Sequence, residues 1–138
     1  MSSVEAAVAT HRVLVVDDEI SVLEAMQRLL ERWGCEVITT GTPEEAEASV
    51  ISGERLPDLL IVDYRLRRHA SGIETIGRLH QLAGRPIPAL IVTGDTAPDR
   101  LREAQASGYP LLHKPVMPGQ LHTAIRQLMV RAETGREA

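Results

Sequence analysis

Acidic side chains follow two apolar runs of this sequence at the point where each run ends. Asp17 and Asp18 come directly after residues 13–16, and Asp63 comes directly after residues 58–62. Aspartate is a good helix N-cap, which would explain one or two of these carboxylates. It does not explain why Asp17 and Asp18 are adjacent, because crowded like charges disfavour each other's ionised form. A cluster of carboxylates suits a hard cation such as Mg²⁺, and the crowding also predicts a positively charged side chain nearby.

Two further apolar runs end on polar residues of other kinds. Thr93 follows residues 88–92, and Lys114 follows residues 110–113. Taken alone, Thr93 is most simply a turn residue and Lys114 a solvated surface charge. If the four runs end at one place, Lys114 supplies the positive charge that the carboxylates need, and Thr93 adds a hydroxyl group. The interpretation therefore depends on whether the fold brings the ends of these runs together.

The apolar runs have the pattern of strands in a parallel sheet. They are short, rich in β-branched residues and continuous rather than alternating, which is typical of strands buried on both faces. Five strands are predicted, at residues 13–16, 35–39, 58–62, 88–92 and 110–113. Five helices are predicted between and after them, at residues 20–33, 42–52, 73–83, a short segment after Pro98, and from Pro118 to about residue 133. This alternation predicts a parallel sheet with helices on both faces, in which ligands bind beyond the carboxyl ends of the strands.

Length and composition indicate one globular domain that binds neither nucleic acid nor a membrane. The chain has 138 residues and a net charge of −4, and it contains no apolar run long enough to span a membrane. An acidic protein is not favoured on nucleic acid or on an anionic membrane surface. The one cysteine, Cys35, cannot form an internal disulfide and fits a reducing cytoplasm. We expect residues 1–10 to be a flexible leader or linker and residues 131–138 to be a flexible tail.

Four segments carry a resemblance to a known family. They are, in chain order, VLVVDDE, LLIVDYRL, ALIVTGD and HKP. The sequence resembles the receiver domain of the two-component response regulator superfamily over about residues 11–130. The resemblance implies a flavodoxin-like (βα)5 three-layer sandwich with a five-stranded parallel sheet of order 2-1-3-4-5. It also implies that Asp63 accepts a phosphoryl group from the phosphohistidine of a histidine kinase or a histidine phosphotransfer domain.

The resemblance further implies which residues hold a metal ion. Asp18 and Asp63 would bind Mg²⁺ directly. Asp17 would act through water or orient the site, and the backbone carbonyl of Arg65 would complete the protein ligands. Carboxylate and carbonyl oxygens are the ligands that Mg²⁺ prefers in proteins, so the residue types agree with the implied roles.

At the remaining strand ends, the resemblance implies contacts with the phosphoryl group. Thr93 would hydrogen-bond a phosphoryl oxygen, and Lys114 would pair with it. The peptide bond between Lys114 and Pro115 would be cis. The sequence departs from the family at Leu111, because many members carry Tyr or Phe three residues before this lysine. Tyr109 is close in sequence, but we expect it to point elsewhere.

Several settings are compatible with such a domain. The segments DYRLRRHASGIE and TGDTAPDRLREAQASGYPLLHKPV resemble those of hybrid-kinase receivers, and the leader resembles an interdomain linker. We therefore favour the C-terminal receiver of a hybrid sensor histidine kinase over a free-standing single-domain regulator. The domain itself would catalyse only its own aspartyl phosphorylation and dephosphorylation, although the parent of a hybrid receiver would be a histidine kinase.

The basic residues Arg65, Arg67 and Arg68 either are solvated or contact a partner histidine domain. A pseudo-receiver, in which this fold serves only to bind proteins, is an alternative of another class. We expect a monomer or a weak dimer.

Overall fold

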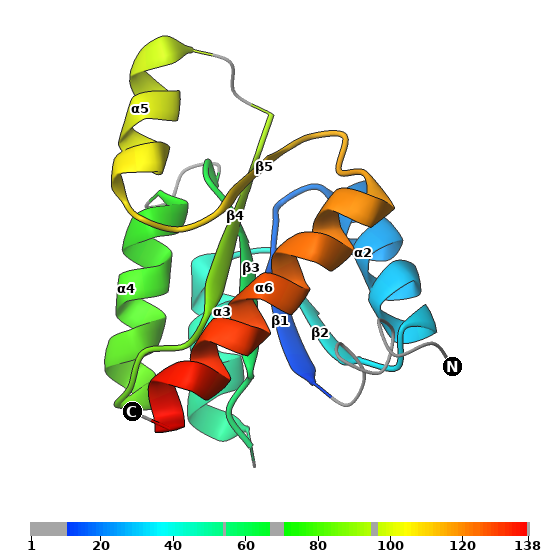
Figure 1. Cartoon of the computed structure of the whole chain (residues 1–138), viewed down its shortest axis with the longest axis vertical. Helices are drawn as coiled ribbons and strands as arrows, with labels where there is room; N and C mark the ends of the chain where they lie inside the picture. The colour runs from blue at the N-terminus through cyan, green and yellow to red at the C-terminus, as the bar shows by residue number, and fades with distance from the viewer. Residues whose placement is uncertain (1–10, 54, 67–70, 95–96, 138) are drawn as a thin grey trace.

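Strands alternate with helices through the part of the chain that the computed structural model describes, which is residues 11–53, 55–66, 71–94 and 97–137. The elements are, in chain order, β1 (Arg12–Val16), α2 (Ile20–Arg32), β2 (Glu36–Thr40), α3 (Pro43–Ser52), β3 (Leu59–Asp63), α4 (Gly72–Ala83), β4 (Ala89–Thr93), α5 (Pro98–Ala106), β5 (Leu111–His113) and α6 (Pro118–Glu137). The strands form one parallel sheet in the order β2-β1-β3-β4-β5 (Figure 1). This order confirms the flavodoxin-like architecture that the family resemblance implied.

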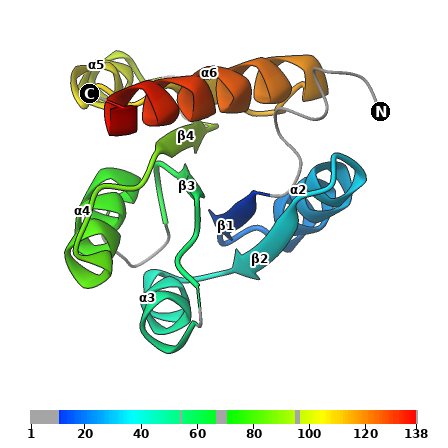
Figure 2. The same ribbon diagram turned by 60° about the horizontal axis from the view of Figure 1, so that its bottom comes forward.

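Helices cover both faces of the sheet. Figure 2 shows α2 and α6 on one side of the strands and α3 and α4 on the other. The buried residues form two clusters that match this arrangement. One cluster includes Leu30 of α2 and Ile125 of α6, and the other includes Val50 of α3, Leu79 of α4 and Ala104 of α5. No helix in the described part of the chain is long and apolar enough to cross a membrane.

Residues along each strand alternate between the two clusters. In β1, Val13 and Val15 pack with α2 and α6, whereas Leu14 and Val16 pack with α3 and α4. Successive side chains of a strand point to opposite faces of its sheet, and here both faces are covered. All five residues of β3 and all five of β4 are therefore buried. This double burial explains why the apolar runs in the sequence are continuous rather than alternating.

Parallel pairing brings the carboxyl ends of the strands to one edge of the sheet. Val16 at the end of β1 lies opposite Val62 of β3. Thr93 at the end of β4 lies opposite His113 of β5. Residues at or just after these positions must share that edge, although they come from distant parts of the sequence.

The last helix is longer than the sequence predicted. α6 continues to Glu137, whereas the prediction ended the helix near residue 133 and assigned residues 131–138 to a flexible tail. The predicted end of the helix was wrong because the segment is rich in arginine, alanine and glutamate, which are good helix formers, and lacks proline. Gly135 weakens a helix by only about 1 kcal/mol. The flexibility of the tail stays a prediction. Residues 1–10 lie outside the described part of the chain, so the flexible leader and the predicted domain limits stay predictions.

Candidate functional site

Polar residues gather at the carboxyl edge of the sheet. Asp17 follows β1, Asp63 is the last residue of β3, Thr93 is the last residue of β4, and Lys114 follows β5. Asp17, Asp63 and Thr93 are all buried. Asp18, next to Asp17, is partly exposed. The structure thus places the five predicted side chains at one edge of the sheet.

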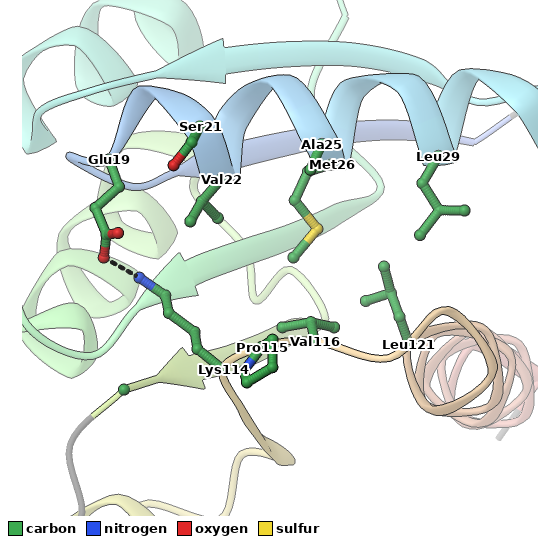
Figure 3. A pocket seen from close by; sticks show the side chains of 11 residues that line it. Glu19, Ser21, Val22, Ala25, Met26, Leu29, Lys114, Pro115, Val116 and Leu121 are labelled. Carbon is green, nitrogen blue, oxygen red and sulfur yellow. Dashed lines mark hydrogen bonds and ion pairs between the residues drawn. The ribbon is translucent and has the colours of Figure 1, made fainter.

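Lys114 is the cation that the crowded carboxylates led us to expect. Its Nζ atom lies 2.9 Å from Oδ2 of Asp17 and 3.3 Å from Oδ2 of Asp63. It also lies 2.9 Å from Oε1 of Glu19, and Figure 3 shows this contact. The Lys114 side chain is only 14% exposed, so salt and water screen these attractions less than they screen a surface pair. One ammonium group therefore joins carboxylates from the ends of β1 and β3.

The two buried carboxylates are held in the same way. Oδ1 of Asp17 accepts a hydrogen bond of 2.9 Å from the backbone N–H of Glu19. Oδ1 of Asp63 accepts one of 3.3 Å from the backbone N–H of Arg65. In each case the donor lies two residues after the aspartate, and the second carboxylate oxygen faces Lys114. Backbone donors on one side and a cation on the other therefore fix the orientation of both carboxylates.

Burial opposes ionisation of both aspartates. Burial raises the pKa of Asp63 to about 6, and the negative charge of Asp17 adds to this rise, while Lys114 and the Arg65 N–H oppose it. Burial also raises the pKa of Asp17, although the Glu19 N–H and Lys114 counteract it. For Lys114, burial alone would lower the pKa, but hydrogen bonds to Glu19 and Asp17 and the charge of Asp63 raise it. The site is therefore an acidic pocket whose negative charge is incompletely compensated.

The same carboxylates have the spacing of a cation site. One oxygen from each of Asp17, Asp18, Glu19 and Asp63 can be chosen so that all four lie within 4.8 Å of one another. Ligand oxygens on opposite sides of a Mg²⁺ ion are about 4 Å apart, so the donor type and the spacing both fit a hard divalent cation. Asp17, Asp18 and Asp63 were predicted for this role, whereas Glu19 was not.

Glu19 was missed because its sequence position gave another explanation for it. It follows Asp18 directly and is the N-cap residue of α2, and an acidic residue at a helix start needs no further role. Its side chain makes no hydrogen bond to cap the helix, however, and pairs with Lys114 instead. The sequence feature that could have indicated this role is the run of three acidic residues at the end of VVDDE, which places Glu19 next to the two predicted aspartates.

The segment after Asp63 is described only in part. Arg65 forms an isolated antiparallel bridge with Ser71, so these two residues lie side by side. The predicted ligand role of the Arg65 carbonyl stays a prediction. Arg67 and Arg68, which belong to the predicted basic loop, lie outside the described residues.

The ends of β4 and β5 are joined by the backbone. The carbonyl of Thr93 accepts a hydrogen bond of 2.8 Å from the N–H of Lys114. The Lys114–Pro115 peptide bond is cis, as the family resemblance implied. Tyr109 precedes β5 and lines a hollow with residues 86–89, which precede or begin β4. It therefore lies at the opposite end of the sheet, and the prediction that it points away from the site is confirmed.

Gly72 makes a close backbone contact with the end of β3. Its N–H donates a hydrogen bond of 2.7 Å to the carbonyl of Tyr64. A Cβ atom at this position would lie 2.3 Å from the carbonyl oxygen of Asp63, which no real Cβ tolerates. The first residue of α4 must therefore be glycine if the backbone of Asp63 is to stay where it is.

An apolar groove adjoins the acidic pocket on one side. It has a volume of about 560 Å³ and lies between α2 and the segment that joins β5 to α6 (Figure 3). Its walls are formed by Val22, Ala25, Met26 and Leu29 of α2 and by Pro115, Val116 and Leu121 opposite them. Glu19 and Lys114 also line it, so the groove borders the ammonium group that contacts the buried aspartates.

Comparison with known proteins gives a consistent result. Residues 13–126 match the family described as the response regulator receiver domain. The chain is 31% identical over 123 residues to the alkaline phosphatase synthesis transcriptional regulatory protein PhoP of Bacillus subtilis, covering 88% of this chain and 50% of that protein. It is 34% identical over 127 residues to the alginate biosynthesis transcriptional regulatory protein AlgB of Pseudomonas aeruginosa, covering 91% and 27%. The chain thus spans half or less of the length of these relatives.

Solved structures show the same fold. A CheY-like response regulator receiver domain protein from Methanospirillum hungatei is similar with a TM-score of 0.78 and 25% identity, over 92% of this chain and 99% of that one. A response regulator receiver domain protein from Clostridium thermocellum is similar with a TM-score of 0.77 and 26% identity, over 90% and 98%. In both cases the likeness spans nearly the whole of the solved chain.

Replacement of Gly72 by alanine tests the backbone contact at the end of β3. We expect Gly72→Ala to lower the free energy of unfolding by about 1–3 kcal/mol, because the added methyl group must displace the Asp63 backbone. Gly77 of the same helix is a matched control, since nothing lies within 4 Å of a Cβ added there. Gly77→Ala should raise stability by about 0.5–1 kcal/mol. Urea unfolding measures both values, and an equal gain in the two variants would contradict the contact.

Replacement of Asp63 by asparagine tests the raised pKa. The pKa of Asp63 is higher in the folded protein than in the unfolded chain, so ionisation of Asp63 destabilises the fold as the pH rises from about 4 through about 6. Without divalent metal, Asp63→Asn should therefore stabilise the protein by up to about 3 kcal/mol at about pH 7.5. The gain should shrink as the pH is lowered towards about 4.

Urea unfolding at several pH values, with a chelator present, measures this dependence. Asp99→Asn serves as the control, because Asp99 is 90% exposed and should change stability by less than about 0.5 kcal/mol. If Asp63→Asn were as stable as the parent protein at every pH, the ionised carboxylate would not be destabilised by its surroundings.

Proposed function

Because this chain belongs to the response regulator receiver domain family, we propose that it accepts a phosphoryl group on Asp63 as a step in a His–Asp phosphorelay. The observation that carries this proposal is the position of Asp63. Its carboxylate is buried at the carboxyl edge of the sheet, within 4.8 Å of other carboxylate oxygens and 3.3 Å from the Lys114 ammonium. A nucleophile, a site for a divalent cation and a fixed positive charge are thereby adjacent, which is what phosphoryl transfer requires.

Asp63 would act as the nucleophile. An oxygen of its carboxylate forms a bond to phosphorus, while the bond from phosphorus to the histidine nitrogen of the donor breaks and its electron pair stays on that nitrogen. The reaction needs the ionised carboxylate, and a pKa of about 6 leaves Asp63 mostly ionised at neutral pH. The burial that raises this pKa also removes water from around the nucleophile.

The neighbouring residues would stabilise the phosphoryl group. Negative charge is spread over three phosphoryl oxygens during the transfer. Lys114 lies within ion-pair distance of Asp63 already and would pair with one of these oxygens. Thr93, at the end of the adjacent strand β4, would donate a hydrogen bond from its hydroxyl to another.

Asp17, Asp18 and Asp63 would hold Mg²⁺, together with the backbone carbonyl of Arg65. When bound, the ion would neutralise negative charge on the carboxylates and on the phosphoryl oxygens. The close spacing of the carboxylate oxygens supports this assignment. Asp17 would orient the site through its hydrogen bond from Glu19 and its ion pair with Lys114.

We propose a histidine kinase or a histidine phosphotransfer domain as the donor, in the cytoplasm, with no direct part for nucleic acid. The curated relatives reported above are titled transcriptional regulators, and this chain matches half or less of each. They give no support to the hybrid-kinase setting that the sequence favoured, so this setting stays a prediction. A receiver within a transcriptional regulator or a free-standing receiver would use the same site.

Calorimetry tests the metal ligands. We expect Mg²⁺ to bind the parent protein, and Asp18→Asn to weaken binding by about tenfold or more, since the loss of an outer-shell partner alone has such an effect. Asp99→Asn removes the same charge at an exposed position on α5 and should leave the affinity unchanged. Equal affinities in the parent protein and Asp18→Asn would remove Asp18 from the ligand set.

Phosphopeptide mapping tests the phosphoacceptor. The protein is incubated with acetyl phosphate and Mg²⁺, the aspartyl phosphate is reduced with borohydride, and the labelled peptide is identified by mass spectrometry. We expect label at Asp63 and loss of that label in Asp63→Asn. Label at the parental level in Asp63→Asn would identify another acceptor. A folded parent protein that takes up no label and does not respond to beryllofluoride with Mg²⁺ would instead be a pseudo-receiver.

A further inference from the structure

The ion pair between Glu19 and Lys114 is not explained by the start of the helix or by the core. The Glu19 carboxylate is half exposed, with 50% of its side-chain area accessible, and makes no capping hydrogen bond to α2. It turns instead towards Lys114 and lies 2.9 Å from Nζ. Figure 3 shows Glu19 and Lys114 reaching towards each other across the end of the apolar groove.

This ion pair occupies the last free hydrogen-bond donor of Lys114. An ammonium group has three N–H donors, and three carboxylates lie within ion-pair distance of this one: Asp17, Glu19 and Asp63. While a phosphoryl group approaches the ionised Asp63, one of its oxygens can gain a donor from Lys114 only if one of these carboxylates releases the ammonium group. The identity of that partner then affects how readily the phosphoryl group is accepted.

Of the two partners other than the nucleophile Asp63, Glu19 can leave with the smaller penalty. Asp17 is buried and its other oxygen is fixed by a backbone N–H, so separation from Lys114 would leave an uncompensated charge away from water. Glu19 is half exposed, and water can replace the ammonium around its carboxylate. An ion pair of this exposure contributes little to stability, which allows it to open during the reaction.

We propose that Glu19 is a positioning residue that retains Lys114 in the unphosphorylated site and thereby slows phosphorylation of Asp63. This inference rests on the proposed phosphoacceptor function and adds a control of its rate. Glu19 releases Lys114 when the phosphoryl group arrives, and its carboxylate then turns into water. Loss of the Glu19 charge leaves one donor of Lys114 free for the incoming phosphoryl oxygen.

The test is the rate of phosphorylation by acetyl phosphate at saturating Mg²⁺, followed by mass spectrometry of the intact protein. In this reaction an Asp63 oxygen bonds to phosphorus, and the bond from phosphorus to the acetyl oxygen breaks, so that acetate leaves with the electron pair. We expect Glu19→Gln to raise the initial rate about two- to fivefold, the range that the loss of an exposed ion pair allows. Glu24→Gln is the matched control, because Glu24 is exposed on the same helix and its substitution removes the same charge.

A second pair of variants distinguishes retention of Lys114 from simple repulsion of an anionic donor. In a Lys114→Ala background, Glu19→Gln should no longer change the rate, because no ammonium group remains to be released. A rise that persists in that background, or an equal rise in Glu24→Gln, would overturn the proposal in favour of general charge repulsion. A rate in Glu19→Gln that equals the parental rate or falls below it would also overturn it.

The two proposals fail in different ways. If the parent protein takes up no phosphoryl group, the phosphoacceptor function itself is refuted. If the parent protein is phosphorylated at Asp63 but Glu19→Gln behaves as the parent does, only the role of Glu19 is refuted. Urea unfolding of Glu19→Gln confirms that the variant is folded, and its half-exposed position makes a change above about 1 kcal/mol unexpected.

Discussion

The site depends on the attraction between one largely buried ammonium group and the two buried carboxylates that it joins. Asp17 and Asp63 end neighbouring strands, their charges repel, and burial disfavours the ionised form of each. Lys114 comes from β5 at the edge of the sheet and lies 2.9 and 3.3 Å from them. Without it, uncompensated charge would remain buried, which is strongly destabilising. The arrangement is therefore complete only when β1, β3 and β5 occupy their places in one sheet.

The same balance of charges makes the site responsive to ligands. Even beside Lys114, Asp63 has a pKa of about 6, so the surrounding protein still disfavours its ionised form. A ligand shifts an equilibrium only through a difference in its affinity for the two states. A divalent cation placed among these carboxylates relieves repulsion that the folded protein contains and the unfolded chain does not. The repulsion that lowers the stability of the metal-free domain would thus favour the binding of a cation.

Much of this arrangement could be predicted from the sequence, because burial on both faces leaves continuous apolar runs and parallel strands share one carboxyl edge. Asp17, Asp63, Thr93 and Lys114 were found in this way. The contact between Glu19 and Lys114 was not, since hydrophobic periodicity reports which residues are buried and not which exposed charge meets which. The contact of Gly72 with the Asp63 backbone was not predicted either, because close approach of two backbones has no signature in a single sequence. The end of α6 was misplaced because good helix formers in residues 131–137 outweigh one glycine.

The strands that carry the site differ in how firmly they are held. β1 and β3 are central and almost wholly buried, with helices on both faces. β5 has three residues, lies at the edge of the sheet, and none of its residues is fully buried. Elements with little buried surface belong to the low-stability end of a fold. If Asp63 accepts a phosphoryl group as proposed, a movement of Lys114 towards that group would act on this weakly held strand. Through the Thr93–Lys114 backbone hydrogen bond it would also act on the end of β4. Because Asp63 ends a central, fully buried strand, phosphorylation would leave β1 and β3 in place, and its effect would pass to β5 and the segment that leads to α6.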